Sequence, residues 1–170
     1  MGVVGVKNCP FAGLTYWVRM ARRLVMGAEG RKFANGVNME NAKHVRIYAD
    51  EAGESHFEDL ETELTFMDFA PPAAPLTMAP FLAAAKTQWL GAPLGWAGDV
   101  PHPSPGRQIF CTTQGEYEVT ASDGGVRRFP AGAVLLLEDT WGKGHRTTVT
   151  SEIDLVVLVV TLAESETAGA

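Results

Sequence analysis

The sequence predicts an all-β fold, in the form of a sandwich or barrel of packed sheets. Between residues 108 and 162, short runs rich in β-branched and aromatic residues are separated by turn residues about every ten positions, a spacing typical of sandwiches and barrels. The run LVVLVV that follows Asp154 has no polar interruption, so both of its faces must be covered. The length of 170 residues suits one such domain with its own core.

Composition narrows the class of protein further. Hydrophobic residues make up 46% of the chain and charged residues 20%, which are ordinary values for a globular protein. The net charge of -6 argues against a nucleic-acid partner, because such a partner favours a basic surface. The two cysteines, Cys9 and Cys111, are too few for a disulfide framework and suit a reducing compartment, so we expect a cytoplasmic protein.

The first part of the chain, residues 1–43, differs from the rest in charge. It carries a net charge of +5, which leaves -11 for the remainder. Residues 11–26 could form one amphipathic helix, which is too short and too charged to span a membrane. We favour a poorly ordered extension that is dispensable before Met39; the alternative is an Arg-rich organellar transit segment.

The folded domain is expected to begin at His44, with a polar tail after Leu162. In its first half, residues 52–61 are expected to form a polar loop with a solvated His56, and residues 81–86 a helical turn or two. Strands are expected at 44–50, 60–69, 86–91, 108–114, 116–122, 126–129, 133–138, 145–151 and 155–160, with a loop around Trp96, Gly98 and Asp99.

Strand alternation brings the candidate polar residues to one surface. With a pleat period of two, the side chains of His102, Ser104, Gln108 and Phe110 point the same way. On the following strands, Tyr117 and His145 are expected to face inward. Two of the four histidines therefore meet in one predicted cavity.

The spacing around these residues resembles the first motif of the cupin superfamily, G-x5-H-x-H-x3-E-x6-G. His102, Ser104, Gln108 and Gly115 fall at its two histidines, its glutamate and its closing glycine. Ser104 thus replaces a histidine and Gln108 replaces the carboxylate, while Trp96 stands at the position of the opening glycine.

The second cupin motif, G-x5-P-x-G-x2-H-x3-N, is matched at its glycines and its histidine. Gly132 opens it, and Gly142 with His145 reproduces the G-x2-H ending. Residues 138–141 lengthen the middle by two positions, and Val149 stands where the asparagine would be. The resemblance covers residues 96–160 well and residues 44–94 loosely.

The resemblance implies a single cupin-type jelly-roll barrel over residues 44–163, followed by a polar tail at 164–170. It also implies one divalent metal ion, Zn, Fe, Mn or Ni, held by His102, Gln108 and His145. A glutamine oxygen is neutral and stabilises a dication less than the carboxylate of the family would.

Three functions fit such a cavity. In the first, the protein is a metal-assisted enzyme of isomerase, lyase or oxygenase type that acts on a small molecule. In the second, no metal is bound and a histidine, oriented by Asp99 or Asp139, serves as a general base. In the third, the barrel binds a ligand or another protein without catalysis, and the histidines are satisfied core residues.

The loop that contains Lys143 is the second candidate region. It is expected at the mouth of the barrel, where Lys143 would act with His102 and His145 by holding an anionic group of the substrate. The ligand pocket is expected to include Trp96, Asp99, Ser104, Phe110, Tyr117, Asp139 and Trp141.

Two apolar stretches predict that the protein pairs with itself. Residues 155–160 and the edge-like strand at 62–69 offer more apolar and unpaired surface than one barrel covers. We therefore expect a homodimer, since two-fold dimers are the most common closed assembly.

Overall fold

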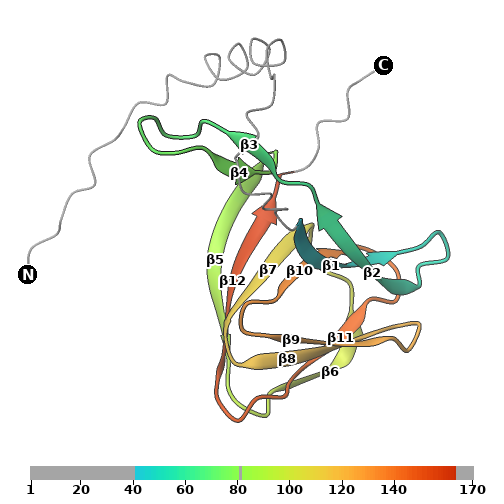
Figure 1. The fold of residues 1–170 in the computed structure, drawn as a ribbon. Coiled ribbons are helices and arrows are strands. Elements are labelled where there is room, and N and C mark those ends of the chain that lie inside the picture. Colours follow the sequence, from blue (N-terminus) through green and yellow to red (C-terminus); the bar gives the residue numbers. More distant parts are fainter. Residues whose placement is uncertain (1–40, 81, 164–170) are drawn as a thin grey trace, which may run out of the picture. The chain divides into compact units, whose positions relative to one another are not determined.

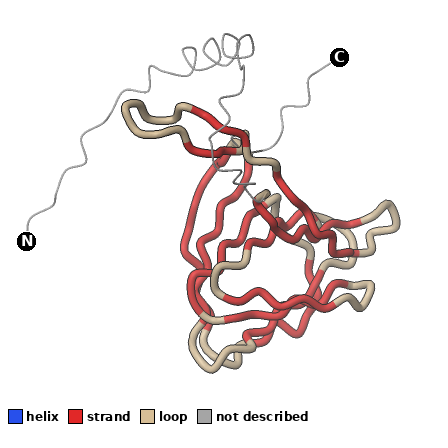
Figure 2. Tube along the Cα trace, in the orientation of Figure 1, coloured by secondary structure: helices blue, strands red, loops and turns tan. Residues whose placement is uncertain are grey.

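The computed structural model describes residues 41–80 and 82–163, which consist of strands and loops without a helix (Figure 2). The predicted N-terminal helix, the possible start at Met39 and the polar tail lie outside these residues. In the described part of the chain, no helix is long and apolar enough to cross a membrane.

Eight strands form a jelly roll of two sheets. They are β5 (Ala84–Ala92), β6 (Ala97–His102), β7 (Gln108–Gln114), β8 (Glu116–Ala121), β9 (Val126–Pro130), β10 (Val134–Glu138), β11 (His145–Val149) and β12 (Leu155–Leu162). Four of them run in the order β10-β7-β12-β5 in one sheet, and the other four in the order β6-β11-β8-β9 in the second (Figure 1). The first of the eight strands thus lies beside the last, the second beside the seventh, and the fourth beside the fifth. This nesting is the jelly-roll topology, and it confirms the predicted fold class.

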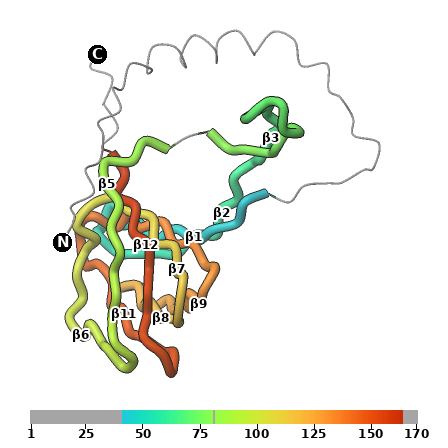
Figure 3. Tube along the Cα trace, turned by 90° about the vertical axis from the view of Figure 1, so that its left-hand side faces the viewer, coloured from blue at the N-terminus to red at the C-terminus, as the bar shows by residue number. Residues whose placement is uncertain are grey.

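Two further hairpins precede the jelly roll. Strand β1 (Ala42–Ala49) extends the larger sheet by pairing parallel to β10, and β2 (Ser55–Thr62) pairs antiparallel to β1 as the next edge. Strands β3 (Thr65–Met67) and β4 (Leu76–Met78) form a separate two-stranded sheet. The larger sheet therefore has six strands, of which β5, β12 and β7 run side by side in Figure 3.

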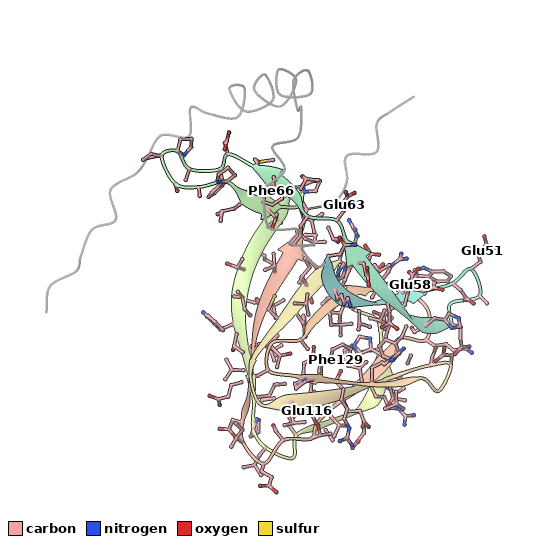
Figure 4. The ribbon with its side chains drawn as sticks, in the orientation of Figure 1. Glu51, Glu58, Glu63, Phe66, Glu116 and Phe129 are labelled. Carbon is pink, nitrogen blue, oxygen red and sulfur yellow. The ribbon has the colours of Figure 1, made fainter. Side chains whose placement is uncertain are left out.

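The core lies between the two sheets and follows the pleat of their strands. On β12, Leu155, Val157 and Val159 are buried, whereas the alternate residues are half-buried on the outer face of the sheet. From the smaller sheet, the rings of Tyr117 and Phe129 stack with their centroids 5.2 Å apart. Figure 4 shows Phe129 inside the barrel and Glu51 at the exposed tip of the first hairpin.

Three local predictions were wrong, each because strand pairing overrides local composition. Residues 52–61, predicted as a polar loop, contain most of β2, which pairs with β1 over eight residue pairs. The helix-favouring residues at 84–86 belong to β5, where they pair with β12. The expected loop at 96–99 contains the start of β6, which pairs with β11.

Consequently His56 is a strand residue that joins two turns. Its Nδ1 lies 2.8 Å from Asp123 Oδ2 in the β8–β9 turn, and its Nε2 lies 3.2 Å from Asp50 Oδ2 in the β1–β2 turn. Hydrogen bonds to Asp50 and then to Asp123 raise the pKa of the imidazole. The backbone N–H of Glu54, followed by His56, lowers the pKa of Asp50.

These two shifts predict a pH window for the stability of the fold. A raised imidazole pKa contributes stability below the unfolded value of about 6.5, and this is lost as pH rises through the higher folded pKa. The lowered pKa of Asp50 contributes stability above its unfolded value of about 3.9, which is lost as pH falls through the folded pKa. The joint contribution is therefore greatest between about pH 4 and about pH 6.5.

We expect the free energy of unfolding, measured with urea, to fall as pH rises above about 6.5. The variant His56→Gln should lose most of this decrease, because its side chain does not titrate. His44→Gln, on β1, is the matched control and should keep it. An identical pH dependence in His56→Gln and wild type would contradict the assignment to His56.

Candidate functional site

A cavity of about 340 Å³ lies between the two sheets of the jelly roll. Most of its wall is apolar, with side chains such as Leu90, Phe110, Leu137 and Val157. The polar side chains that line it are His102, Ser104, Gln108, Tyr117, His145 and Thr147. No carboxylate, ammonium or guanidinium group is among the described residues of this wall.

The two histidines meet because β6 and β11 are neighbours. His102 at the end of β6 is paired in register with His145 at the start of β11, and their ring centroids lie 5.2 Å apart. The preceding residue, Gly144, has φ of +70°, and a Cβ there would lie 2.1 Å from the carbonyl carbon of His102. Only glycine therefore allows the backbone of β6 to approach the start of β11 so closely.

His145 is held by a carboxylate that solvent does not reach. Its Nδ1 lies 2.6 Å from Asp139 Oδ2, and the two residues are 4% and 0% exposed. Asp139 Oδ2 also accepts a hydrogen bond from Ser55 Oγ at 3.3 Å, and its backbone carbonyl accepts one from the N–H of Ser104 at 3.0 Å. Such a dyad fixes the orientation of the imidazole within the cavity wall.

Hydrogen bonding also sets the tautomer of both rings in their neutral form. A carbonyl oxygen only accepts, so His102 Nδ1, at 3.1 Å from the carbonyl of Pro103, carries a proton. His145 Nδ1 likewise donates to the Asp139 carboxylate. Each Nε2 then presents a lone pair, which makes it available as a proton acceptor.

The structure brings most of the predicted pocket residues together. Trp96, Ser104, Gln108, Phe110 and Tyr117 line the cavity, and Asp139 lies directly behind His145. Burial raises the pKa of the Tyr117 phenol, so this hydroxyl stays protonated.

Three predicted residues lie elsewhere. Lys143 forms an ion pair with Glu54 of the β1–β2 turn and does not line the cavity. Asp99 is exposed on β6, and Trp141 packs near Gly53 with half of its surface exposed. The loop from Glu138 to Gly144 folds against the β1–β2 turn, which is why Lys143 and Trp141 point away from the mouth.

Ser55 is the residue of the site that sequence patterns miss. It is fully buried and donates to Asp139, although 84 positions separate the two residues along the chain. Ser55 lies on a hairpin outside the eight jelly-roll strands, where no motif of the resemblance applies. No local signal in the sequence marks it.

As they stand, these residues do not fit a resident divalent metal ion. A catalytic zinc site commonly takes three protein ligands, and a charged ligand stabilises a dication best. The described residues contain no cluster of three or more His, Cys, Asp or Glu side chains suited to a metal. His102, His145 and Gln108 are all neutral donors, and the Asp139 carboxylate is engaged behind His145.

Two solved structures are distantly similar to this chain. No family model and no curated protein matches the chain. The Cnp3 cupin domain of Schizosaccharomyces pombe is 12% identical with a TM-score of 0.37, over 74% of this chain and 86% of that one. A putative ethanolamine utilization protein Q of Salmonella typhimurium LT2 is 12% identical with a TM-score of 0.33, over 73% of this chain and 98% of that one. By its own strand order, the chain has the jelly-roll fold that its resemblance to cupins implies.

Proposed function

We propose that this protein binds a small molecule with an apolar body and one acidic head group, and that His145 accepts a proton from that head. The observation that carries the proposal is the hydrogen bond between His145 and Asp139 in the wall of an otherwise apolar cavity.

The distribution of polar groups supports this class of ligand. Leu90, Phe110, Leu137 and Val157 would surround the apolar body, which a pocket of this size excludes from water. The head would lie beside His102 and His145, and its single acid proton would pass to Nε2 of His145. A cationic ligand would find no carboxylate on this wall to pair with, so its desolvation would go uncompensated.

Asp139 explains why His145, rather than His102, is the proton acceptor. When a bound acid gives up its proton, the imidazolium of His145 lies between the new anion and the buried carboxylate. His102 is exposed at the mouth and its Nδ1 contacts only a neutral carbonyl. We therefore assign His102 a binding role and His145 the role of base.

Simple probes test the ligand class. We expect hexanoate, bound together with one proton that His145 takes up, to bind at least about tenfold more tightly than hexanamide or hexylamine, because a charge-assisted hydrogen bond is worth about 1.5–3 kcal/mol. Calorimetry measures the affinity, and Trp96 in the cavity wall offers a fluorescence signal. His145→Gln and His102→Ala should remove this preference, while His44→Gln should keep it. Equal affinities for the three probes would overturn the proposed head-group recognition.

A divalent metal at His102, Gln108 and His145 stays a prediction. These three residues include no carboxylate, so a variant that supplies one tests the predicted site. Gln108→Glu would place a carboxylate in the same cavity wall as the two imidazoles, so we expect this variant to bind Zn²⁺ at least about tenfold more tightly than wild type. Gln114→Glu, an exposed change on the same strand, is the matched control and should have no effect. A folded Gln108→Glu variant that binds no metal would exclude the predicted metal site.

We also propose that the protein is a homodimer, paired through the outer face of the larger sheet. Cross-strand register aligns two apolar rows there, Leu136–Ile109–Val160 and Val134–Cys111–Leu158–Trp89. Beside the rows, Glu138 is already paired with Arg46 and Arg107, so two copies would not bring unpaired like charges together. A two-fold contact places this patch against itself, apolar rows on apolar rows.

Light scattering at micromolar concentration measures the assembly directly. We expect the mass of a dimer for wild type and the mass of a monomer for Leu158→Asp, because the substitution puts a charge at the centre of the patch. Val126→Asp, on the exposed part of β9 in the other sheet, should remain dimeric. A monomeric mass for the wild-type protein would disprove this pairing.

A further inference from the structure

The β1–β2 turn, which does not belong to the jelly roll, is fastened to the loop that carries Asp139. The N–H of Lys143 donates to the carbonyl of Gly53 at 2.8 Å, and Lys143 Nζ pairs with Glu54. Gly53 and Gly142 lie so close that a Cβ at Gly142 would fall 2.3 Å from the carbonyl oxygen of Gly53. This contact brings the start of β2 behind the cavity.

The first residue of β2, Ser55, is held on its backbone as well as its side chain. Its N–H donates to Ser122 Oγ at 2.8 Å, and its carbonyl accepts from the N–H of Asp123 at 3.4 Å. Both bonds join the turn to the β8–β9 turn. With its backbone held in this way, Ser55 points its hydroxyl at Asp139 from a fully buried position.

Asp139 has few other groups to hold it. Its Oδ2 accepts from His145 and from Ser55, whereas its Oδ1 has no hydrogen-bond partner among the described residues. The cation closest in sequence, Lys143, is paired with Glu54 instead. A buried carboxylate with one free oxygen can rotate about its Cβ–Cγ bond unless its bonded oxygen is fixed, and two donors fix it better than one.

We propose that Ser55 is a positioning residue for His145, acting through Asp139. By donating to Oδ2, the Ser55 hydroxyl holds that oxygen where it accepts the Nδ1 proton of His145. Nδ1 therefore keeps its proton and Nε2 keeps its lone pair toward the cavity. This inference rests on the proposed role of His145 as proton acceptor, for which that tautomer is required.

A purely structural role for Ser55 makes a different prediction. If its hydroxyl only satisfied its own burial, the loss of the hydroxyl would lower stability and leave the imidazole of His145 unchanged. The tautomer of His145 separates the two roles, because the chemical shifts of its ring nitrogens report directly which nitrogen carries the proton. The measurement uses the full chain without any ligand.

In wild type we expect long-range proton–nitrogen spectra to show His145 protonated at Nδ1, with a slowly exchanging Nδ1 proton. In Ser55→Ala we expect the ratio of the two tautomers to shift by roughly tenfold toward Nε2–H, and the Nδ1 proton to exchange faster, since a hydrogen bond to a charged group is lost. Ser55→Thr retains the hydroxyl and should restore the wild-type spectrum.

The matched control is Ser151→Ala, which removes a hydroxyl that donates to the carbonyl of Ile153 and bonds neither Ser55 nor Asp139. It should destabilise the protein and leave the tautomer of His145 unchanged. An unchanged tautomer in Ser55→Ala, or an equal shift in Ser151→Ala, would overturn the positioning role. If the tautomer shifts as expected but hexanoate is not preferred, the proposed function fails and the positioning role stands.

Discussion

The hydrogen bond between His145 and Asp139 is the interaction on which the candidate site depends. Both partners are buried, so neither can be left unpaired without a large desolvation cost. The bond fixes the ring of His145 against the wall of the cavity and determines which nitrogen faces inward. His102 and the apolar wall can contribute to the proposed ligand binding only when the imidazole of His145 is held in place.

The jelly roll supplies the geometry for this bond. Its nesting places β6 beside β11, so two histidines that are 43 positions apart become cross-strand neighbours. The fold also points two consecutive acidic residues in opposite directions. Glu138 pairs with arginines on the outer face, whereas Asp139 turns inward to His145. Burial would raise the pKa of Glu138, but the hydrogen bonds and charges of Arg107 and Arg46 outweigh it and lower that pKa.

Charged groups are therefore concentrated outside the barrel, and they join strands rather than line the cavity. Arg46 and Arg107 link β1, β7 and β10 through Glu138, and His56 links two turns through Asp50 and Asp123. Because no carboxylate, ammonium or guanidinium group of the described residues lines the cavity, the hydrogen-bonding groups of His102 and His145 strongly influence which ligand can enter.

The sequence alone determined the all-β class and the inward direction of Tyr117 and His145. It also indicated His102, Gln108 and Asp139 as candidate site residues. Both results are possible because pleat period and motif spacing are local properties of the sequence. Only the tertiary structure decided the position of Lys143 and Ser55. Lys143 was predicted at the mouth but pairs with Glu54, and Ser55 was not predicted at all. Both depend on how the β1–β2 hairpin packs against a loop 84–89 positions later, and such long-range contacts leave no periodic trace in the sequence.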